Sequence, residues 1–401
     1  MKRIILSALF TLLMAFTLTE SYACTSAIIT GKLTKDGKPL LWKHRDTGEL
    51  NNRIEYFKGP KYTFLALVNS PDSGGIAWTG TNNVGFSIMN TASYNLRDAN
   101  DGVDDKEMDR EGELMFKALG ECRTIDDFEK FLKKYKKPFG VEGNFGVIDA
   151  EGGAAYFEVN NTRWEKIDVN DPKIAPQGYL VYTNHSYTGR LNEGMGYIRY
   201  TAADTRIKNL IAQGGEITPR WIFNNLSRCF YHPVLDMDLK EAELGSGWFI
   251  DQDFIPRRIT SASVVIKGVK KGEDPLNTVM WTILGYPPAS IAVPLFVKAG
   301  ENQPFFMVKG EKSNNALMCD ISLKAKSKIF AIKRGNGNKY FNFGALYNKK
   351  GNGLMQRMQR AESKVFKISA EFIKEHKDKE MKKEELDSFY NSLFEVIKKA
   401  Y

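Results

Sequence analysis

A cysteine stands at the junction between an apolar leader and the first β-rich run of the chain. Cys24 opens the run CTSAIIT. The segment before it has two basic residues near its start, an apolar stretch over residues 4–18, and Ser21-Tyr22-Ala23 at its end. A charged head, a short apolar middle and small residues three and one positions before the cut are typical of a secretory signal peptide. The stretch is too short for a bilayer-spanning helix, which needs about 20 residues. We therefore predict a signal peptide over residues 1–23, whose removal would make Cys24 the first residue.

A cysteine in first position carries both a nucleophile and a base. The reference pKa values of an α-amine, about 7.7–8.0, and of a thiol, about 8.5, lie close together. The amine of Cys24 could therefore take the thiol proton directly or through one water. The thiolate would attack a carbonyl, and the protonated amine would return the proton to the leaving nitrogen. Such a reaction also needs two donors for the oxyanion and a polar group that orients the amine.

Three other interpretations of Cys24 stay open. It could be a small buried residue at a strand start, or the lipidated cysteine of a bacterial lipoprotein. Tyr22 is bulky and Ser21 is polar where lipoprotein signals prefer small and aliphatic residues, so ordinary signal cleavage is favoured. In the third interpretation His185 forms a Cys–His dyad and replaces the amine as the base.

The remaining cysteines and histidines form no metal-binding pattern. If Cys24 stays free, three cysteines remain, so at least one is a lone thiol and no disulfide framework is expected. The histidines show no HExxH or CxxC-type spacing, and we predict no metal site and no cofactor. These residues are Cys122, Cys229, Cys319, His44, His185, His232 and His376.

The ordered motifs over roughly residues 24–310 resemble the N-terminal-nucleophile (Ntn) hydrolases that cleave linear amide C–N bonds. This group comprises choloylglycine (bile salt) hydrolases, penicillin V acylases and acyl-CoA:isopenicillin N acyltransferases. CTSAIIT resembles the group's first strand, with Cys24 as the nucleophile. WKHRDTG resembles its R-N-x-D stretch, which implies that Asp46 holds the amine. Lys43 stands where bile salt hydrolases have arginine, and an ammonium cannot reproduce the fork of a guanidinium, for which Arg45 could compensate.

Three further segments complete the resemblance. NNVGFSIMNTAS ends on Asn90, which corresponds to the asparagine whose backbone lies by the oxyanion hole. VYTNHS resembles the group's T-N-S or T-N-H turn, which implies that Asn184 is a side-chain oxyanion donor. GYIRYTAADTR resembles the S-R-x-x-R helix start near the active site, with Arg199 as the best match although the preceding serine is absent. The catalytic set implied by the resemblance is Cys24, Lys43, Asp46, Asn90, Asn184 and Arg199.

The elements that must position these residues alternate in blocks. Short β-rich runs up to residue 92 precede two helices over 107–136, with Thr124 as the N-cap of the second. Strands resume over 144–159 and 178–186, helices over 197–213 and 218–230, and strands in SASVVIKGV, TVMWTILG and KIFAIKRG. Strands and helices in separate blocks favour a layered α+β fold. The resemblance implies the four-layer αββα sandwich of the Ntn hydrolases.

The chain is expected to hold one Ntn-hydrolase domain over residues 24–350 and a C-terminal helical tail over 351–401. The net charge of +9 is spread along the chain, with lysines concentrated in the tail, so we expect solvated helical faces rather than nucleic-acid binding. We predict an exported, periplasmic or secreted enzyme without a transmembrane segment, acting on a small-molecule N-acyl amide. A dipeptidase-like enzyme, an acyltransferase and a lipid-anchored binding protein are the alternatives, and the oligomeric state stays open.

Overall fold

The computed structural model describes residues 23–401 except 244, 312 and 378. The predicted signal peptide therefore lies outside the described residues apart from Ala23. Among the described residues no helix combines the length and the apolar character that crossing a membrane requires. All four cysteines are buried free thiols.

Two antiparallel sheets form the centre of the molecule. The order of the six-stranded sheet is β10 (Tyr179–Tyr182), β1 (Thr25–Ile29), β2 (Leu40–Asp46), β14 (Thr260–Lys267), β15 (Val279–Leu284) and β16 (Val293–Phe296). The seven-stranded sheet follows chain order: β3 (Asn52–Lys58), β4 (Thr63–Asn69), β5 (Thr79–Asn82), β6 (Ser87–Ala92), β7 (Gly143–Ile148), β8 (Ala154–Val159) and β9 (Trp164–Asp168). Strands β1 and β2 pack against β6 and β7, so the two sheets face each other.

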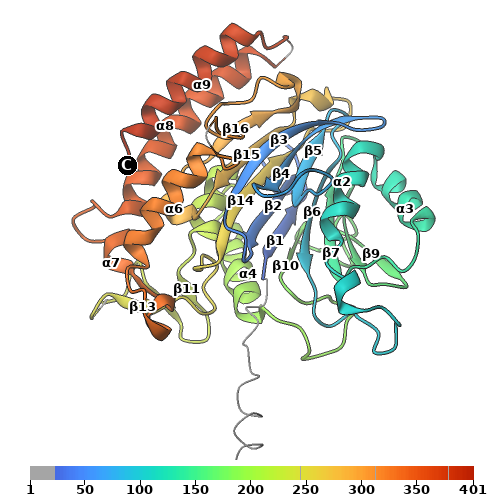
Figure 1. Ribbon diagram of the computed structural model, residues 1–401, viewed down its shortest axis with the longest axis horizontal. Helices are drawn as coiled ribbons and strands as arrows, with labels where there is room; N and C mark the ends of the chain where they lie inside the picture. Colours follow the sequence, from blue (N-terminus) through green and yellow to red (C-terminus); the bar gives the residue numbers. More distant parts are fainter. Residues whose placement is uncertain (1–22, 244, 312, 378) are drawn as a thin grey trace, which may run out of the picture.

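Helices cover both outer faces of this pair of sheets (Figure 1). On the seven-stranded sheet, α2 (Glu111–Glu121) and α3 (Ile125–Lys134) share an apolar core with the strands. Helices α4 (Tyr197–Ala212), α5 (Pro219–Ile222), α6 (Leu317–Ile329), α7 (Phe343–Leu346), α8 (Leu354–Glu375) and α9 (Lys383–Lys398) share the other core, with the six-stranded sheet. The expected four-layer αββα arrangement is confirmed.

Several local predictions are also confirmed. Thr124 caps α3: its side chain accepts from the Asp127 amide, and the Asp127 side chain accepts in return from the Thr124 amide. Within the segment 218–230, residues 219–227 are helical, as α5 and a π-helical turn, Phe223–Ser227. Two short two-stranded sheets pair β11 (Tyr231–His232) with β12 (Met237–Asp238), and β13 (Trp248–Ile250) with β17 (Tyr340–Asn342).

The prediction of a strand in KIFAIKRG is wrong. Its first residues are the last turn of α6, and residues 331–333 have no regular structure. The buried positions Met318, Cys319, Ser322, Ala325 and Ile329 recur at helical spacing up to and into the start of the run. A short apolar run alone does not distinguish a buried strand from the end of a buried helix.

Strand β2 is the element that positions the site. Successive side chains of a strand point to opposite faces. Accordingly Lys43 and Arg45 contact Trp78, the residue before β5 of the other sheet, whereas His44 and Asp46 face Thr260. The register between β2 and β14 shifts between Thr260 and Ala262, opposite the end of β2. Such bulges bend a strand and re-aim its side chains.

Candidate active site

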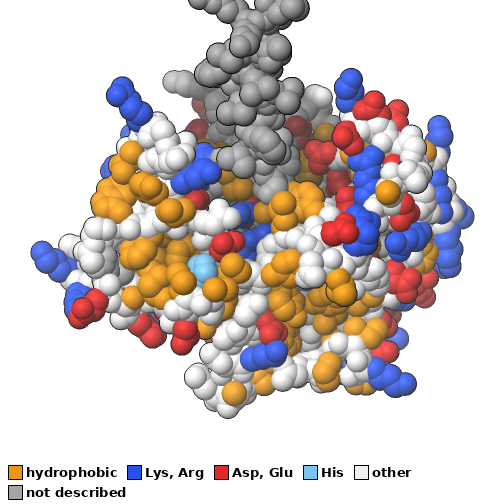
Figure 2. All heavy atoms as spheres, turned by 90° about the horizontal axis from the view of Figure 1, so that it is seen from below, with side chains coloured by type: hydrophobic (Ala, Val, Ile, Leu, Met, Phe, Trp, Pro, Cys, Tyr) orange, Lys and Arg blue, Asp and Glu red, His pale blue; other side chains and the backbone are white. Residues whose placement is uncertain are grey.

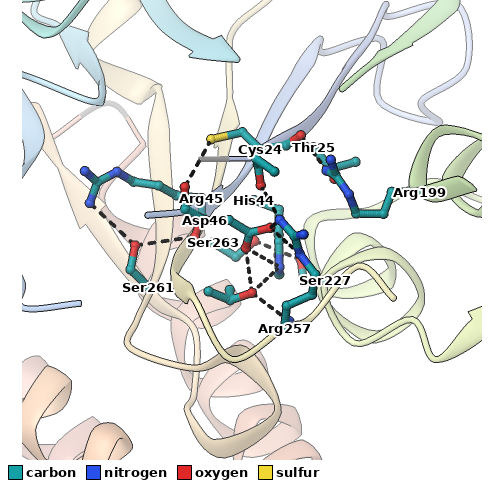
Figure 3. Close-up of polar contacts among 12 residues, drawn as sticks. Cys24, Thr25, His44, Arg45, Asp46, Arg199, Ser227, Arg257, Ser261 and Ser263 are labelled. Carbon is teal, nitrogen blue, oxygen red and sulfur yellow. Dashed lines mark hydrogen bonds and ion pairs between the residues drawn. The ribbon is translucent and has the colours of Figure 1, made fainter. Parts of the chain in front are cut away.

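All six residues implied by the resemblance are buried at one end of the sheet pair: Cys24, Lys43, Asp46, Asn90, Asn184 and Arg199. Cys24 directly precedes β1, between β2 and β10, and is 8% exposed. Its thiol points toward the backbone carbonyl of Asp46, with Sγ 4.0 Å from that oxygen. Figure 3 shows Cys24 beside His44, Arg45 and Asp46 from the end of β2, together with Arg199 and Arg257.

Arg199 joins Cys24 and the start of β1 to the turn after β10. Its Nη1 donates to the Cys24 carbonyl at 2.7 Å and to Thr25 Oγ1 at 2.8 Å, and its Nη2 donates to Asn184 Oδ1 at 2.7 Å. Burial, with a smaller effect of the like charge on Arg257, lowers the pKa of Arg199 to about 10. The guanidinium therefore stays charged at neutral pH and fixes both the Cys24 backbone and the Asn184 amide.

Asn184 also connects the two sheets. Its Nδ2 donates to the carbonyl of Ala92 at 2.9 Å, at the end of β6, the strand that carries Asn90. This contact and the one with Arg199 set the plane of the carboxamide.

Lys43 lies between the two sheets. Its Nζ donates to Asn90 Oδ1 at 2.5 Å and to the Trp78 carbonyl at 2.7 Å. Burial lowers the pKa of Lys43 to about 7, and Cys24 and Glu111 oppose this effect. Arg45 does not share these contacts: it donates to Asn69 Oδ1 at 2.8 Å and its guanidinium lies 4.6 Å from the centre of the Trp78 ring.

Asp46 is held by groups that the sequence patterns did not single out. Arg257 donates to Asp46 Oδ2 through Nε at 3.0 Å and Nη2 at 2.5 Å, and Thr260 Oγ1 donates to Oδ1 at 2.6 Å. The same Nη2 is 3.1 Å from the carbonyl oxygen of Ala23, the residue before Cys24. Arg257 stands in PRRITSASVV, where neither arginine is distinguished by a motif.

A second unpredicted group is the carboxyl of Glu111, at the start of α2. It is 5% exposed, its Oε1 accepts from the Glu142 amide at 3.0 Å, and its Oε2 has no hydrogen-bond partner among the described residues. Burial, followed by the neighbouring charge of Asp109, raises the pKa of Glu111 to about 8. Glu111 has the sequence pattern of an ordinary polar position on an amphipathic helix. Its burial and its charge effect on the pKa of Lys43 are therefore difficult to predict from sequence.

No contact among the described residues supports a catalytic dyad of Cys24 and His185. His185 Nδ1 lies 3.0 Å from Thr183 Oγ1, and its ring stacks on Tyr197 with centroids 4.5 Å apart. No hydrogen bond joins His185 to Cys24 within the described part of the chain. In that same part, no group of three or more His, Cys, Asp or Glu residues could hold a metal ion.

Apolar side chains are exposed near the same end of the molecule. Leu191 and Met195 lie on the segment leading into α4, and Tyr197 is the first residue of that helix. Val234, Leu235 and Ile250 lie around β11 and β13. Figure 1 places α4, β11 and β13 toward the lower end, and Figure 2, the view from below, shows apolar side chains spread over this face between charges of both signs.

No protein-family model matches the chain, and no curated protein is significantly similar in sequence. Solved structures do resemble it. The Caenorhabditis elegans ortholog of N-acylethanolamine-hydrolyzing acid amidase is 14% identical, covering 61% of this chain and 92% of its own, with a TM-score of 0.39. A mutant of the conjugated bile acid hydrolase from Clostridium perfringens is 12% identical over 68% of this chain and 92% of its own, with a TM-score of 0.42. Penicillin V acylase from Agrobacterium tumefaciens is 10% identical over 68% and 86%, with a TM-score of 0.33.

Proposed function

We propose that the chain is a cysteine amidohydrolase that cleaves a linear N-acyl amide through an acyl-thioester on Cys24. The proposal rests on the hydrogen bonds around the Cys24 backbone. Arg199 binds its carbonyl, and Arg257 joins the carbonyl just before it to the Asp46 carboxylate. Once Ala23 is removed, the new amine would lie next to the thiol and near a carboxylate that can orient it.

Each residue then has a distinct task. The amine of Cys24 takes the thiol proton, and the thiolate attacks the amide carbonyl. Asn184, whose carboxamide plane is fixed by Arg199 and Ala92, donates from its side chain to the oxyanion, and the backbone at Asn90 supplies the second donor. The protonated amine gives its proton to the leaving nitrogen, and water then hydrolyses the thioester. Lys43 holds Asn90 in place.

The substrate is proposed to be a small N-acyl amide of the bile-salt, N-acyl amino acid or acylamide type. The exposed apolar residues around α4, β11 and β13 favour an acyl group that is itself apolar. The leader pattern supports export to the periplasm or the outside of the cell. Signal cleavage alone would then expose the nucleophile.

The alternatives differ in what happens to Cys24 or to the acyl group. Acyl transfer to a second amine and dipeptidase-like cleavage would use the same nucleophile. A lipid-anchored binding protein would carry a diacylglycerol on Cys24, which the intact mass of the exported protein would reveal.

The test compares two forms of the protein, one that begins at Cys24 and one that keeps a single extra residue before it. With the extra residue the Cys24 nitrogen is a peptide amide and has no basic lone pair. We expect that form to fold but not to turn over N-acyl amides, whereas the form that begins at Cys24 should be active. Cys24→Ser should be much weaker, since a hydroxyl is a poorer nucleophile than a thiol at neutral pH. Equal rates, with the extra residue verified by N-terminal sequencing, would contradict the self-base mechanism.

A further inference from the structure

Arg257 binds two groups close to the point where the predicted leader meets the folded chain. Its Nη2 donates to Asp46 Oδ2 at 2.5 Å and to the Ala23 carbonyl oxygen at 3.1 Å. The carbonyl oxygen and the nitrogen of one peptide are about 2.3 Å apart, so Nη2 lies within about 5.4 Å of the Cys24 nitrogen. The guanidinium is therefore a close neighbour of the atom that becomes the α-amine.

Arg257 keeps its charge in this position. Burial lowers its pKa, but the attraction of Asp46 outweighs this, so the pKa of Arg257 is raised overall. The Asp46 carboxylate is thus paired with a permanent cation before any amine is formed. Its remaining oxygen accepts from Thr260.

The other titratable groups around this pair come from several elements. His44 of β2 has its pKa lowered to about 4 by burial, so it is neutral at pH 7. Burial raises the pKa of Asp251 and lowers that of Lys326 on α6 to about 8. Further groups with charge effects here are Arg199, Asp253, Arg258, Tyr286 and the Cys24 thiol.

We propose that Arg257 is a positioning residue that neutralises Asp46 and thereby keeps the amine of processed Cys24 unprotonated and able to accept the thiol proton. The inference rests on the proposed function, since it requires Cys24 to be the first residue. A carboxylate alone would favour the ammonium form, which cannot act as a base, and a nearby guanidinium opposes this effect. At about 5 Å, a unit charge shifts a partner's pKa by on the order of one to two units. Asp46 can then orient the amine without protonating it.

The test reads the amine directly and needs no substrate. Processed protein labelled with [15N]cysteine is titrated by NMR, because of the four cysteines only Cys24 would have an amine nitrogen. Arg257→Met should raise the pKa of the Cys24 amine by about one unit or more, whereas Asp46→Asn should lower it. Arg257→Lys retains the charge and should stay close to wild type. Arg206→Met, which breaks the partly buried pair of Arg206 with Asp238 elsewhere, is the matched control and should cause no shift.

Opposite shifts in the Arg257→Met and Asp46→Asn variants would support the proposal. An unchanged amine pKa in Arg257→Met, or an equal shift in Arg206→Met, would overturn it. If a thermal melt shows that Arg257→Met is unfolded, the Asp46→Asn and Arg257→Lys variants decide. An Asp46→Asn variant in which the pKa of the Cys24 amine does not fall then overturns the inference. The acidic limb of kcat/KM is measured in parallel. If the pKa of the Cys24 amine shifts as expected while this limb stays fixed, the role of Arg257 is supported and the amine is not the catalytic base. Failure of this inference and failure of the proposed function are therefore distinguishable.

Discussion

Lys43 and Asn90 join the two central sheets through one short hydrogen bond at the site, 2.5 Å from Nζ to Oδ1. Lys43 lies on β2 of the six-stranded sheet and Asn90 on β6 of the seven-stranded sheet. The bond fixes which end of the Asn90 carboxamide faces the lysine. It also couples the strand that carries Asp46 to the strand whose backbone is the proposed second oxyanion donor.

The first prediction concerns the charge on Lys43. Lys43→Met should lower kcat at least about tenfold, because Asn90 loses the donor that positions it. The pKa of Lys43 is lowered to about 7, so its ammonium charge disappears as pH rises above 7. Arginine stays protonated throughout. Lys43→Arg should therefore retain more activity than Lys43→Met, and its rate should fall less between pH 7 and 9. An alkaline limb identical to wild type in Lys43→Arg would contradict this role.

The second prediction concerns the oxyanion donor. Removing one such donor costs about 10²–10³ in kcat, and we expect this loss for Asn184→Ala on a confirmed substrate. Arg199 and Ala92 also lose a partner in this variant, so its thermal melt must be compared with wild type. Full kcat in a folded Asn184→Ala protein would remove Asn184 from the mechanism.

The third prediction links Glu111 to pH-dependent stability. The pKa of Glu111 is raised from its usual value, about 4.3, to about 8. Its contribution to stability is therefore fully present below about pH 4 and is lost as pH rises to about 8, because the folded state binds the proton more tightly. Gln carries no such proton. The gain in the free energy of unfolding of Glu111→Gln over wild type should grow from pH 5 to pH 8 and then level off.

Urea unfolding at several pH values measures this difference. Glu113→Gln is the matched control, since Glu113 lies in the same first turn of α2 but is partly exposed and paired with Arg110. Its difference from wild type should change little with pH. A difference for Glu111→Gln that is equally flat would contradict the burial effect.

Most of the fold could be predicted from periodicity and local signals. The runs CTSAIIT, TFLALV and SASVVIKGV are compact, rich in β-branched and apolar residues, and became β1, β4 and β14. NRIEYFK and WEKID, which form β3 and β9, carry a weaker strand signal because they mix charges with apolar residues and are only partly buried. The end of α6 has the sequence pattern of a strand because IFAI alone carries no helical period.

The site divides in a similar way. The motif order led to Cys24, Asp46 and Asn184, because Cys24 directly precedes a recognisable strand, Asp46 ends one and Asn184 follows one. Arg257 could not be found in this way. It lies 211 positions from Asp46, and their pairing depends on how β14 is placed beside β2. An arginine next to another arginine before a strand has the same local pattern as a surface charge.

The fourth prediction concerns the attachment of the C-terminal helices. Arg228, after the π-helical turn, makes a two-pronged ion pair with Glu362 of α8, at 2.8 and 2.7 Å, and both side chains are almost fully buried. Glu362 also accepts from the Ala292 amide at 2.9 Å. Removing one partner of a buried pair leaves an uncompensated charge and costs about 3–5 kcal/mol. Glu362→Ala should lose this much unfolding free energy, whereas the double variant Arg228→Met/Glu362→Leu should recover a large part of it. Glu371→Ala, an exposed change on the same helix, should stay within about 0.5 kcal/mol of wild type. A similar loss of unfolding free energy in Glu362→Ala and Glu371→Ala would show that the helix, rather than the buried pair, is responsible.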